Sequence, residues 1–215
     1  LMVHKDPKKV MIIGLASGVS AGSALLHPVE RVDCAEISPA VVAASRLFKE
    51  IGASKLDYED PRFNLIMDDG RHFLDLSEEK YDVIIAEPSN PWISGMSVLF
   101  TREFFEIMKS RLNPDGVALI WIGAYDMDAY TVRMLLRTFN EVFDNCTMWE
   151  SKPLVDYFVI GSKKPVEIDM EEFVKKGNRP KVAGDLKRIN VDHPRELFAR
   201  FMMGPQTIKQ VSGEG

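Results

Sequence analysis

A chain of 215 residues, 46% of them hydrophobic, is long enough to bury the core of one globular domain. Its formal net charge of −5 arises from interspersed acidic and basic residues, which argues against nucleic acid as a partner. No apolar run reaches the roughly 18 residues of a membrane span, and no signal peptide is recognisable, so we expect no membrane span in this chain and a cytoplasmic location. The chain opens on Leu1 and not on a methionine, from which we expect it to be part of a longer protein.

The cysteines and histidines do not show the spacing of a metal site. Cys34 and Cys146 fall in or beside expected buried strands, where two such thiols are more often reduced core residues than a disulfide. The four histidines are scattered along the chain, at His4, His27, His72 and His193. We therefore expect no bound metal.

The first expected element is a buried strand that turns tightly into a helix. Val10 to Ile13 is a short apolar run suited to a strand buried on both faces, and Gly14 ends it. Mostly small residues follow, and a helix is expected over residues 21–26. Such a turn leaves unpaired backbone N–H groups at the carboxyl edge of a sheet, where α/β proteins bind nucleotide-like ligands.

Short apolar runs alternate with amphipathic stretches almost to residue 150, a pattern typical of a parallel sheet covered by helices. Six further strands are expected, at 31–37, 63–68, 81–86, 117–122, 147–150 and 157–160. Helices are expected at 39–51, 70–76, 101–112 and 128–143, with Ser38 as an N-cap, Pro39 at a first helical position and Thr101 as a second cap. A turn is expected at 113–116.

The last two strands must be antiparallel, because the link between them, around Pro153, is short. The prediction is therefore an α/β fold with a seven-stranded, mostly parallel sheet that ends in an antiparallel hairpin. This is the Rossmann-like fold of class I S-adenosylmethionine-dependent methyltransferases and not the six parallel strands of a dinucleotide-binding domain.

A change in composition after Pro165 divides the chain into two expected parts. Residues 1–163 are expected to form the nucleoside-binding catalytic core. The rest is charged, with helices expected at 170–176 and 194–203. We expect residues 164–215 to form a helical C-terminal extension that packs on the core.

Acidic residues follow the second and third expected strands. Glu36 lies 22 positions after Gly14, where a carboxylate in such folds reaches the ribose hydroxyls of a nucleoside; the alternative is a solvated carboxylate at a strand end. Asp69 can accept from an adenine amino group while Gly70 lets the backbone approach, and Asp69 can also cap the next helix. The expected cofactor-binding set is Gly14, Ser17, Gly18, Glu36, Ile37, Asp69 and Gly70.

The glycine loop distinguishes between classes of cofactor. A dinucleotide fingerprint needs G-x-G-x-x-G, but Ala16 stands at its second glycine and Val19 at its third. Pyrophosphate binding is therefore disfavoured, whereas a nucleoside with a sulfonium side chain needs only the close turn.

A stiff loop, EPSNPW, follows the fourth expected strand. Its two prolines and its tryptophan restrict the backbone, so that its polar groups are held in place. Alkyl transfer from a sulfonium to an amine is a direct displacement, which needs a neutral amine held in line and a group that takes the proton. We expect Glu87 to take the proton and Ser89, Asn90 and Trp92 to bind the amine. The alternative is a rigid connection around a buried tryptophan.

Four segments in order resemble the spermidine synthase family of polyamine synthases, over roughly residues 5–160. They are VMIIGLASGVSAGSALLHP, VERVDCAEISPAVV, DPRFNLIMDDGRHFL and YDVIIAEPSNPWISGMSVLFTREFFEIMKSRLNPDGVALIW. The chain looks closest to spermidine synthase-like domains fused to membrane transporter-like segments. The resemblance implies that Glu36 is the ribose-binding acid, that Asp69 contacts adenine and that the EPSNP loop is the catalytic, gatekeeping segment.

The sequence departs from the family pattern at three positions. Ser17 stands where family members that make spermidine carry the Asp that binds the amino group of decarboxylated S-adenosylmethionine. Glu87 replaces the catalytic Asp, and Asn90 replaces the second Asp of that loop. Polyamines and the aminopropyl donor are cationic, so a site built for them should be rich in carboxylates. Because this site has lost two, the identity of the donor, decarboxylated or ordinary S-adenosylmethionine, stays open.

Three functions follow as expectations. The first is transfer of an aminopropyl group from decarboxylated S-adenosylmethionine to a small amine, and the second is methyl transfer from S-adenosylmethionine. The third is a non-catalytic, ligand-sensing cytoplasmic domain of a membrane protein. A homodimer is an open alternative to a monomer.

Overall fold

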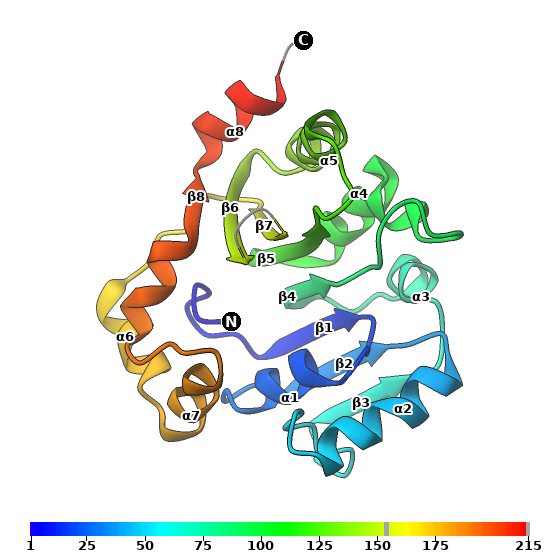
Figure 1. The fold of residues 1–215 in the computed structure, drawn as a ribbon, viewed down its shortest axis with the longest axis vertical. Coiled ribbons are helices and arrows are strands. Elements are labelled where there is room, and N and C mark those ends of the chain that lie inside the picture. The colour runs from blue at the N-terminus through cyan, green and yellow to red at the C-terminus, as the bar shows by residue number, and fades with distance from the viewer. Residues whose placement is uncertain (153–154, 214–215) are drawn as a thin grey trace.

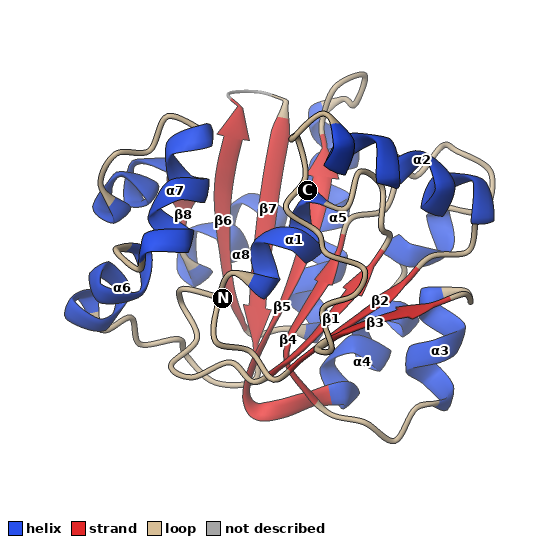
Figure 2. Ribbon diagram, turned by 90° about the horizontal axis from the view of Figure 1, so that it is seen from below, coloured by secondary structure: helices blue, strands red, loops and turns tan. Residues whose placement is uncertain are grey.

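The computed structural model describes residues 1–152 and 155–213, and within them one mixed sheet with helices on both faces (Figures 1 and 2). The strands are β1 (Lys9–Ile13), β2 (Arg31–Ala35), β3 (Phe63–Ile66), β4 (Tyr81–Ala86), β5 (Leu112–Gly123), β6 (Asn145–Lys152), β7 (Asp156–Ser162) and β8 (Phe201–Met203). Their order in the sheet is β3-β2-β1-β4-β5-β7-β6-β8. The first five are parallel, and β7 runs antiparallel between β5 and β6. The predicted α/β fold class is confirmed.

The helices are α1 (Val19–Leu25), α2 (Pro39–Glu50), α3 (Gly70–Leu76), α4 (Arg102–Arg111), α5 (Ala129–Val142), α6 (Met170–Gly177), α7 (Pro180–Arg188) and α8 (Pro205–Ser212), with short 3-10 helices at Ser97–Phe100 and Pro194–Arg200. Side chains cap α2 and α4, as expected from their sequences. Ser38 accepts from Val41 N–H and Thr101 accepts from Phe104 N–H.

The sheet separates two apolar layers (Figure 2). Helices α1 and α2 cover one face, where they pack on the side chains of Val10 and Ile12. Helices α3, α4 and α5 cover the other face, where the side chains of Met11 and Ile84 lie. Strand β1 is therefore buried on both faces, as its continuous apolar sequence predicts. This burial fixes the end of β1, from which the glycine loop departs.

The eighth strand is a difference from the expected sheet. A helix is predicted at 194–203, but Pro194–Arg200 forms a 3-10 helix and the chain then pairs as β8 with the free edge of β6. Phe201 packs edge-to-face on Trp149 of β6 at 5.1 Å between ring centroids. Edge pairing and aromatic packing therefore override the local helical pattern.

Strand β5 also starts earlier than expected. The predicted turn at 113–116 lies inside β5, which changes register against β4 between Tyr81 and Val83. Asn113 Nδ2 donates to Asp82 Oδ1 at 2.6 Å and holds this irregular stretch against β4. The other predicted turn, around Pro153, lies outside the described residues.

The C-terminal extension contacts the core through polar groups as well as through β8. Ser23 Oγ on α1 donates to Asp185 Oδ2 on α7 at 2.6 Å, and buried Lys176 Nζ on α6 donates to the carbonyl oxygen of Lys5 at 2.6 Å. Within residues 1–152 and 155–213, no helix has both the length and the apolar character required to span a bilayer.

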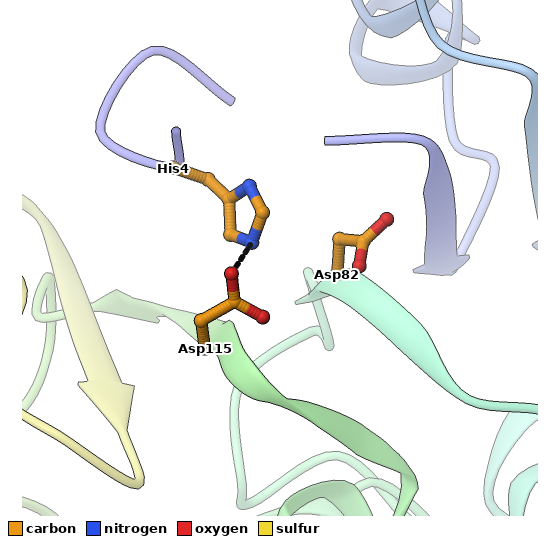
Figure 3. Close-up of side chains that lie close together, drawn as sticks. All are labelled: His4, Asp82 and Asp115. Atoms are coloured by element: carbon orange, nitrogen blue, oxygen red, sulfur yellow. Dashed lines mark ion pairs between the residues drawn. The ribbon is translucent and has the colours of Figure 1, made fainter. Parts of the chain in front are cut away.

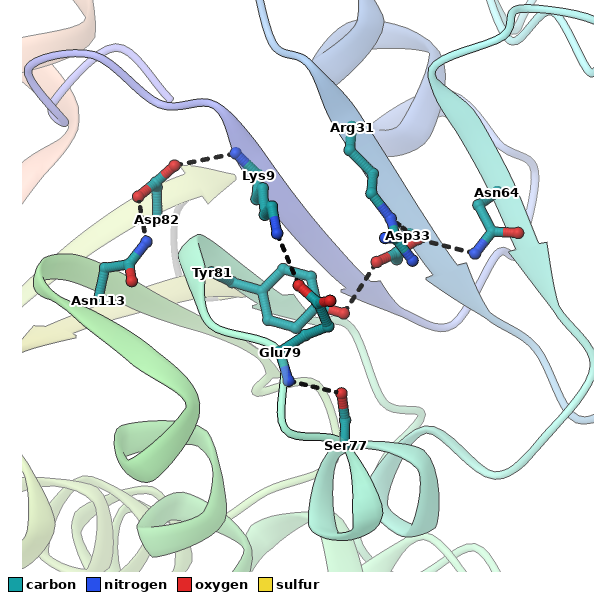
Figure 4. Close-up of polar contacts among 9 residues, drawn as sticks. All are labelled: Lys9, Arg31, Asp33, Asn64, Ser77, Glu79, Tyr81, Asp82 and Asn113. Carbon is teal, nitrogen blue, oxygen red and sulfur yellow. Dashed lines mark hydrogen bonds and ion pairs between the residues drawn. The ribbon is translucent and has the colours of Figure 1, made fainter.

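A polar network ties the strands together at the amino edge of the sheet (Figure 4). Asp33, fully buried on β2, accepts from Arg31 Nε at 2.8 Å, Asn64 Nδ2 at 2.9 Å and the Tyr81 hydroxyl at 2.8 Å. Three donors offset the desolvation of this carboxylate. The network thus fixes the amino ends of β2, β3 and β4 and leaves the opposite edge of the sheet for ligands.

Candidate functional site

The sheet order reverses between β1 and β4, because the chain moves outward through β2 and β3 before it returns to β4. The crevice outside the carboxyl ends of the strands at such a reversal is the usual ligand site of open α/β sheets. Here Ile13 ends β1 beside Ala86, and Glu87 N–H donates to the Ile13 carbonyl at 3.2 Å. The loops after β1 and β4 therefore meet at this point.

The loop after β1 is built from left-handed backbone. Gly14, Ala16 and Gly18 have φ values of 94°, 45° and 75°, and Gly18 N–H donates to the Leu15 carbonyl at 2.7 Å. A Cβ on Gly18 would also lie 2.9 Å from Leu56 Cδ2. Both predicted loop glycines thus occupy positions that favour glycine, and the tight turn predicted from the sequence is present.

Glu36 joins this loop to the loop after β2. It is 8% exposed, and its Oε2 accepts from Leu15 N–H at 3.0 Å while its Oε1 accepts from Ser38 N–H at 2.9 Å. The alternative of a solvated carboxylate at a strand end is therefore wrong. Each carboxylate oxygen can accept more than one hydrogen bond, so a ribose hydroxyl can still be bound.

Two residues of the predicted cofactor set are more accessible. Ser17 is half-buried within the glycine loop, and Ile37, next to Glu36, is 64% exposed. An exposed isoleucine beside a nucleoside-binding carboxylate provides apolar surface that a flat base can cover.

Asp69 caps α3, which the sequence analysis gives as one of its two roles. Its Oδ1 accepts from Arg71 N–H at 2.8 Å and from His72 N–H at 3.1 Å, and among the described residues no donor is bonded to Oδ2, which can accept from another group. Gly70 has a packing role, because a Cβ there would lie 2.6 Å from Ile13 Cγ2. α3 can therefore approach the end of β1 closely enough to place Asp69 at the crevice.

Glu87 contacts a residue that the sequence analysis does not identify. Ser20 Oγ, in the first turn of α1, lies 2.8 Å and 2.9 Å from the two carboxylate oxygens of Glu87 and donates to them. Burial raises the pKa of Glu87 above its ordinary value, and the bond from Ser20 acts in the opposite direction. A desolvated carboxylate with a raised pKa is suited to accept a proton from an amine.

The remainder of the EPSNPW loop presents a second buried polar group. Asn90 is 2% exposed, and its Oδ1 has no hydrogen-bond partner within the described parts of the chain. An unpaired buried oxygen costs about 1–3 kcal/mol, so a ligand N–H at this position would be stabilising. Ser89 is exposed, and Trp92 is 52% exposed, so the alternative of a buried tryptophan is wrong.

Aromatic residues at the end of β5 also lie beside this loop, and the sequence analysis misses them. Tyr125 packs edge-to-face on Trp92, and it also packs on Trp121, with 6.5 Å between ring centroids in both pairs. Trp121 Nε1 donates to Asp156 Oδ1 at 3.2 Å. The sequence contains one signal that could have identified them, because Trp121 and Tyr125 stand at the carboxyl end of a predicted parallel strand.

At the opposite edge of the sheet, His4, Asp82 and Asp115 bring three potential ligand atoms within 4.8 Å of one another (Figure 3). His4 Nδ1 accepts from Asp6 N–H at 3.2 Å, so neutral His4 carries its proton on Nε2, which lies 3.8 Å from Asp115 Oδ2. A metal needs an unprotonated nitrogen. His4 Nε2 is buried without a hydrogen-bond partner among the described residues, and its contact with Asp115 is that of a histidine–carboxylate pair.

Comparison with known proteins gives the chain its relatives. A polyamine aminopropyltransferase of Thermococcus kodakarensis is 30% identical over 188 residues, which cover 81% of this chain and 65% of that protein. Putrescine N-methyltransferase 2 of Nicotiana attenuata is 31% identical over 207 residues, which cover 90% of this chain and 55% of that protein. The chain thus spans less than two thirds of the length of either relative.

A solved structure and a family model agree with the fold. A spermidine synthase in complex with the transition-state analogue AdoDATO superposes with a TM-score of 0.80 at 23% identity, covering 99% of this chain and 71% of that one. The model of the spermine/spermidine synthase domain matches residues 1–153. The chain therefore belongs to the spermine/spermidine synthase domain family.

Proposed function

We propose that this chain transfers an aminopropyl group from decarboxylated S-adenosylmethionine to a small amine. The observation that carries this proposal is the half-buried carboxylate of Glu87, which lies beside the glycine loop where the sheet order reverses and whose pKa is raised by burial. The polyamine aminopropyltransferase among the relatives supports the same reaction.

The donor site of the proposal is formed by the loops after β1, β2 and β3. Glu36 accepts hydrogen bonds from the ribose hydroxyls, and Asp69 accepts from the adenine amino group through the oxygen that α3 does not use. The left-handed backbone of the glycine loop lets the sulfonium side chain pass close to the end of β1. Ile37 covers the base.

The reaction itself is a single displacement. The lone pair of the neutral amine attacks the carbon next to the sulfonium, a C–N bond forms, and the C–S bond breaks with its electron pair on sulfur. The product sulfur is a neutral thioether, and Glu87 takes the proton that the nitrogen loses. Asn90 Oδ1 accepts an N–H of the amine, while Trp92 and Tyr125 form an aromatic wall for a distal cationic group.

The substitution Glu87→Gln tests the proton-acceptor role. Because Gln keeps the shape of the side chain but cannot take a proton, we expect kcat to fall by roughly 100-fold or more with unchanged donor affinity. The control is Glu79→Gln, which removes a carboxylate at the opposite edge of the sheet, where Glu79 pairs with Lys9, and leaves kcat unchanged. Equal activity of Glu87→Gln and the parent protein would show that Glu87 does not take the proton.

A second candidate function is methyl transfer from S-adenosylmethionine. It is favoured by Ser17, a neutral residue in the glycine loop, because a neutral loop with free backbone N–H groups can accept the carboxylate of ordinary S-adenosylmethionine. The putrescine N-methyltransferase among the relatives is consistent with it.

Calorimetric titration with both sulfonium nucleosides separates the two candidates. Tighter binding of the decarboxylated nucleoside supports aminopropyl transfer and counts against the argument from Ser17. Under the methyl-transfer candidate, Ser17→Asp weakens binding of S-adenosylmethionine through repulsion between two carboxylates. Binding of a donor without turnover of any amine would favour the ligand-sensing domain.

A further inference from the structure

A hydroxyl on α1 has no place in the donor and acceptor sites proposed above. Ser20 Oγ donates to both carboxylate oxygens of Glu87, at 2.8 Å and 2.9 Å, although the two residues lie 67 positions apart in the chain. These distances are ordinary for an O–H···O hydrogen bond, and the single hydroxyl proton is shared between the two carboxylate oxygens.

Both partners of this bond are held by rigid elements. On α1, Ala21 and Ala24 are buried, and a Cβ on Gly22 would lie 2.5 Å from Leu56 N, so the helix is packed directly on backbone. On the other side, Glu87 N–H is bonded to Ile13 at the end of β1, and buried Pro88 follows. The hydroxyl and the carboxylate are therefore brought together by the fold and not by flexible side chains meeting at the surface.

The Ser20 hydroxyl is the principal polar partner of the Glu87 carboxylate. The ion pairs found within residues 1–152 and 155–213 do not include Glu87, and residues 14–25 of the glycine loop and α1 carry no titratable side chain. On β2 and just after it, the titratable groups are Arg31, Asp33, Cys34 and Glu36, and the one positive charge among them, Arg31, is bonded to Asp33 at 2.8 Å and forms no ion pair with Glu87 among the described residues. A hydrogen bond to the ionised carboxylate opposes the effect of burial, which favours the neutral acid.

We propose that Ser20 is a positioning residue for the transfer reaction, whose hydroxyl holds the Glu87 carboxylate in a fixed orientation and in its ionised form. This inference rests on the proposed function, in which Glu87 accepts the proton of the amine. It also explains why a glutamate suits this position, because a shorter aspartate at residue 87 would leave the Ser20 hydroxyl out of reach.

The variants Ser20→Ala, Ser20→Thr and Ser23→Ala test the inference. Ser23 is the matched control, because its hydroxyl lies on the same helix but bonds to Asp185 at 2.6 Å and does not touch Glu87. In Ser20→Ala, we expect the acid limb of the kcat/KM profile to move to higher pH by about one unit, with donor affinity unchanged. Ser20→Thr keeps the hydroxyl and restores the profile, and Ser23→Ala does not move it.

A second readout does not depend on turnover. Carbon-13 NMR follows the pH titration of Glu87 in protein labelled at the glutamate carboxyl carbons, and the Glu87 signal is assigned by its loss in Glu87→Gln. The pH at the midpoint of this titration is expected to rise in Ser20→Ala. If this midpoint rises but no amine is alkylated by the parent protein, the contact stands and the proposed function fails. If Glu87→Gln abolishes transfer while Ser20→Ala leaves both the profile and the midpoint unchanged, the positioning role of Ser20 is overturned.

Discussion

At the residue scale, Asp33 shows how the sheet accommodates a charge in its interior. The carboxylate is fully buried, and Tyr81, also fully buried, supplies one of its three side-chain donors. Burial raises the pKa of the Tyr81 hydroxyl, and the charge of Asp33 acts in the same direction, so the hydroxyl remains a donor across the working pH range. A buried carboxylate that loses a donor is penalised more than an exposed one.

The substitution Tyr81→Phe measures this contribution. It removes only the hydroxyl and keeps the ring in the core, so we expect the free energy of unfolding to fall by about 2 kcal/mol. Urea denaturation measures the change. Donor affinity should stay the same, because Tyr81 belongs to the polar network at the amino edge of the sheet (Figure 4), whereas the candidate site lies at the carboxyl ends of the strands. A loss below a few tenths of a kcal/mol would mean that Arg31 and Asn64 alone satisfy Asp33.

At the element scale, two helical glycines predict opposite effects of the same substitution. A Cβ on Gly22 in α1 would lie 2.5 Å from Leu56 N and 2.7 Å from Lys55 C, which are backbone atoms that cannot move aside. A Cβ on Gly184 in α7 has no atom within 4 Å among the described residues. The first glycine is required by packing, and the second only lowers helix propensity.

We therefore expect Gly22→Ala to destabilise the protein by about 3 kcal/mol or more, because α1 must shift away from the 54–56 segment. Gly184→Ala should instead stabilise it, by up to about 1 kcal/mol. Thermal unfolding of the two variants provides the comparison, and donor binding should weaken only in Gly22→Ala, because α1 follows the glycine loop. Similar melting temperatures for both variants would contradict the packing argument.

The elements that can be predicted from the sequence are those set by local chemistry. The strand–glycine–helix unit from Val10 and the caps at Ser38 and Thr101 depend on neighbouring residues alone, and the structure contains them. Strand β8 depends on the free edge of β6, and the early start of β5 depends on a bond between Asn113 and Asp82, so no local pattern could reveal them.

The same distinction applies to the candidate site. The positions of Glu36 and Asp69 after successive strands follow from the strand pattern, and both lie where the parallel strands end. The bond between Ser20 and Glu87 joins segments 67 positions apart and needs the adjacency of β1 and β4, which composition and spacing do not specify.

At the scale of the whole molecule, His27 links stability to pH. It is buried, and desolvation, aided by the charge of Arg179, lowers its pKa to about 3 from an ordinary value of 6.5. The folded protein thus holds His27 neutral, while the unfolded chain binds a proton below about pH 6.5. Stability from this group is complete above that pH and decreases as the pH falls toward 3.

From this group we expect the free energy of unfolding to fall by about 1.4 kcal/mol per pH unit over the lower part of that window. The variant His27→Gln should show a shallower dependence, as measured by urea denaturation between about pH 6 and pH 4. Exposed His72 on α3 supplies the control, since His72→Gln is expected to retain the parent slope. Parallel curves for His27→Gln and the parent protein would show that His27 is accessible to protons in the folded state.

The most direct test of the central claim is mass spectrometry of the amine product from one reaction that contains the protein, putrescine and both sulfonium nucleosides. If the chain is an alkyl transferase of the kind proposed, putrescine gains an aminopropyl group, and the gain is lost in Glu87→Gln. Gain of a methyl group alone would establish the second candidate in place of the first. Unmodified putrescine after prolonged incubation of a protein that binds either nucleoside would contradict the account.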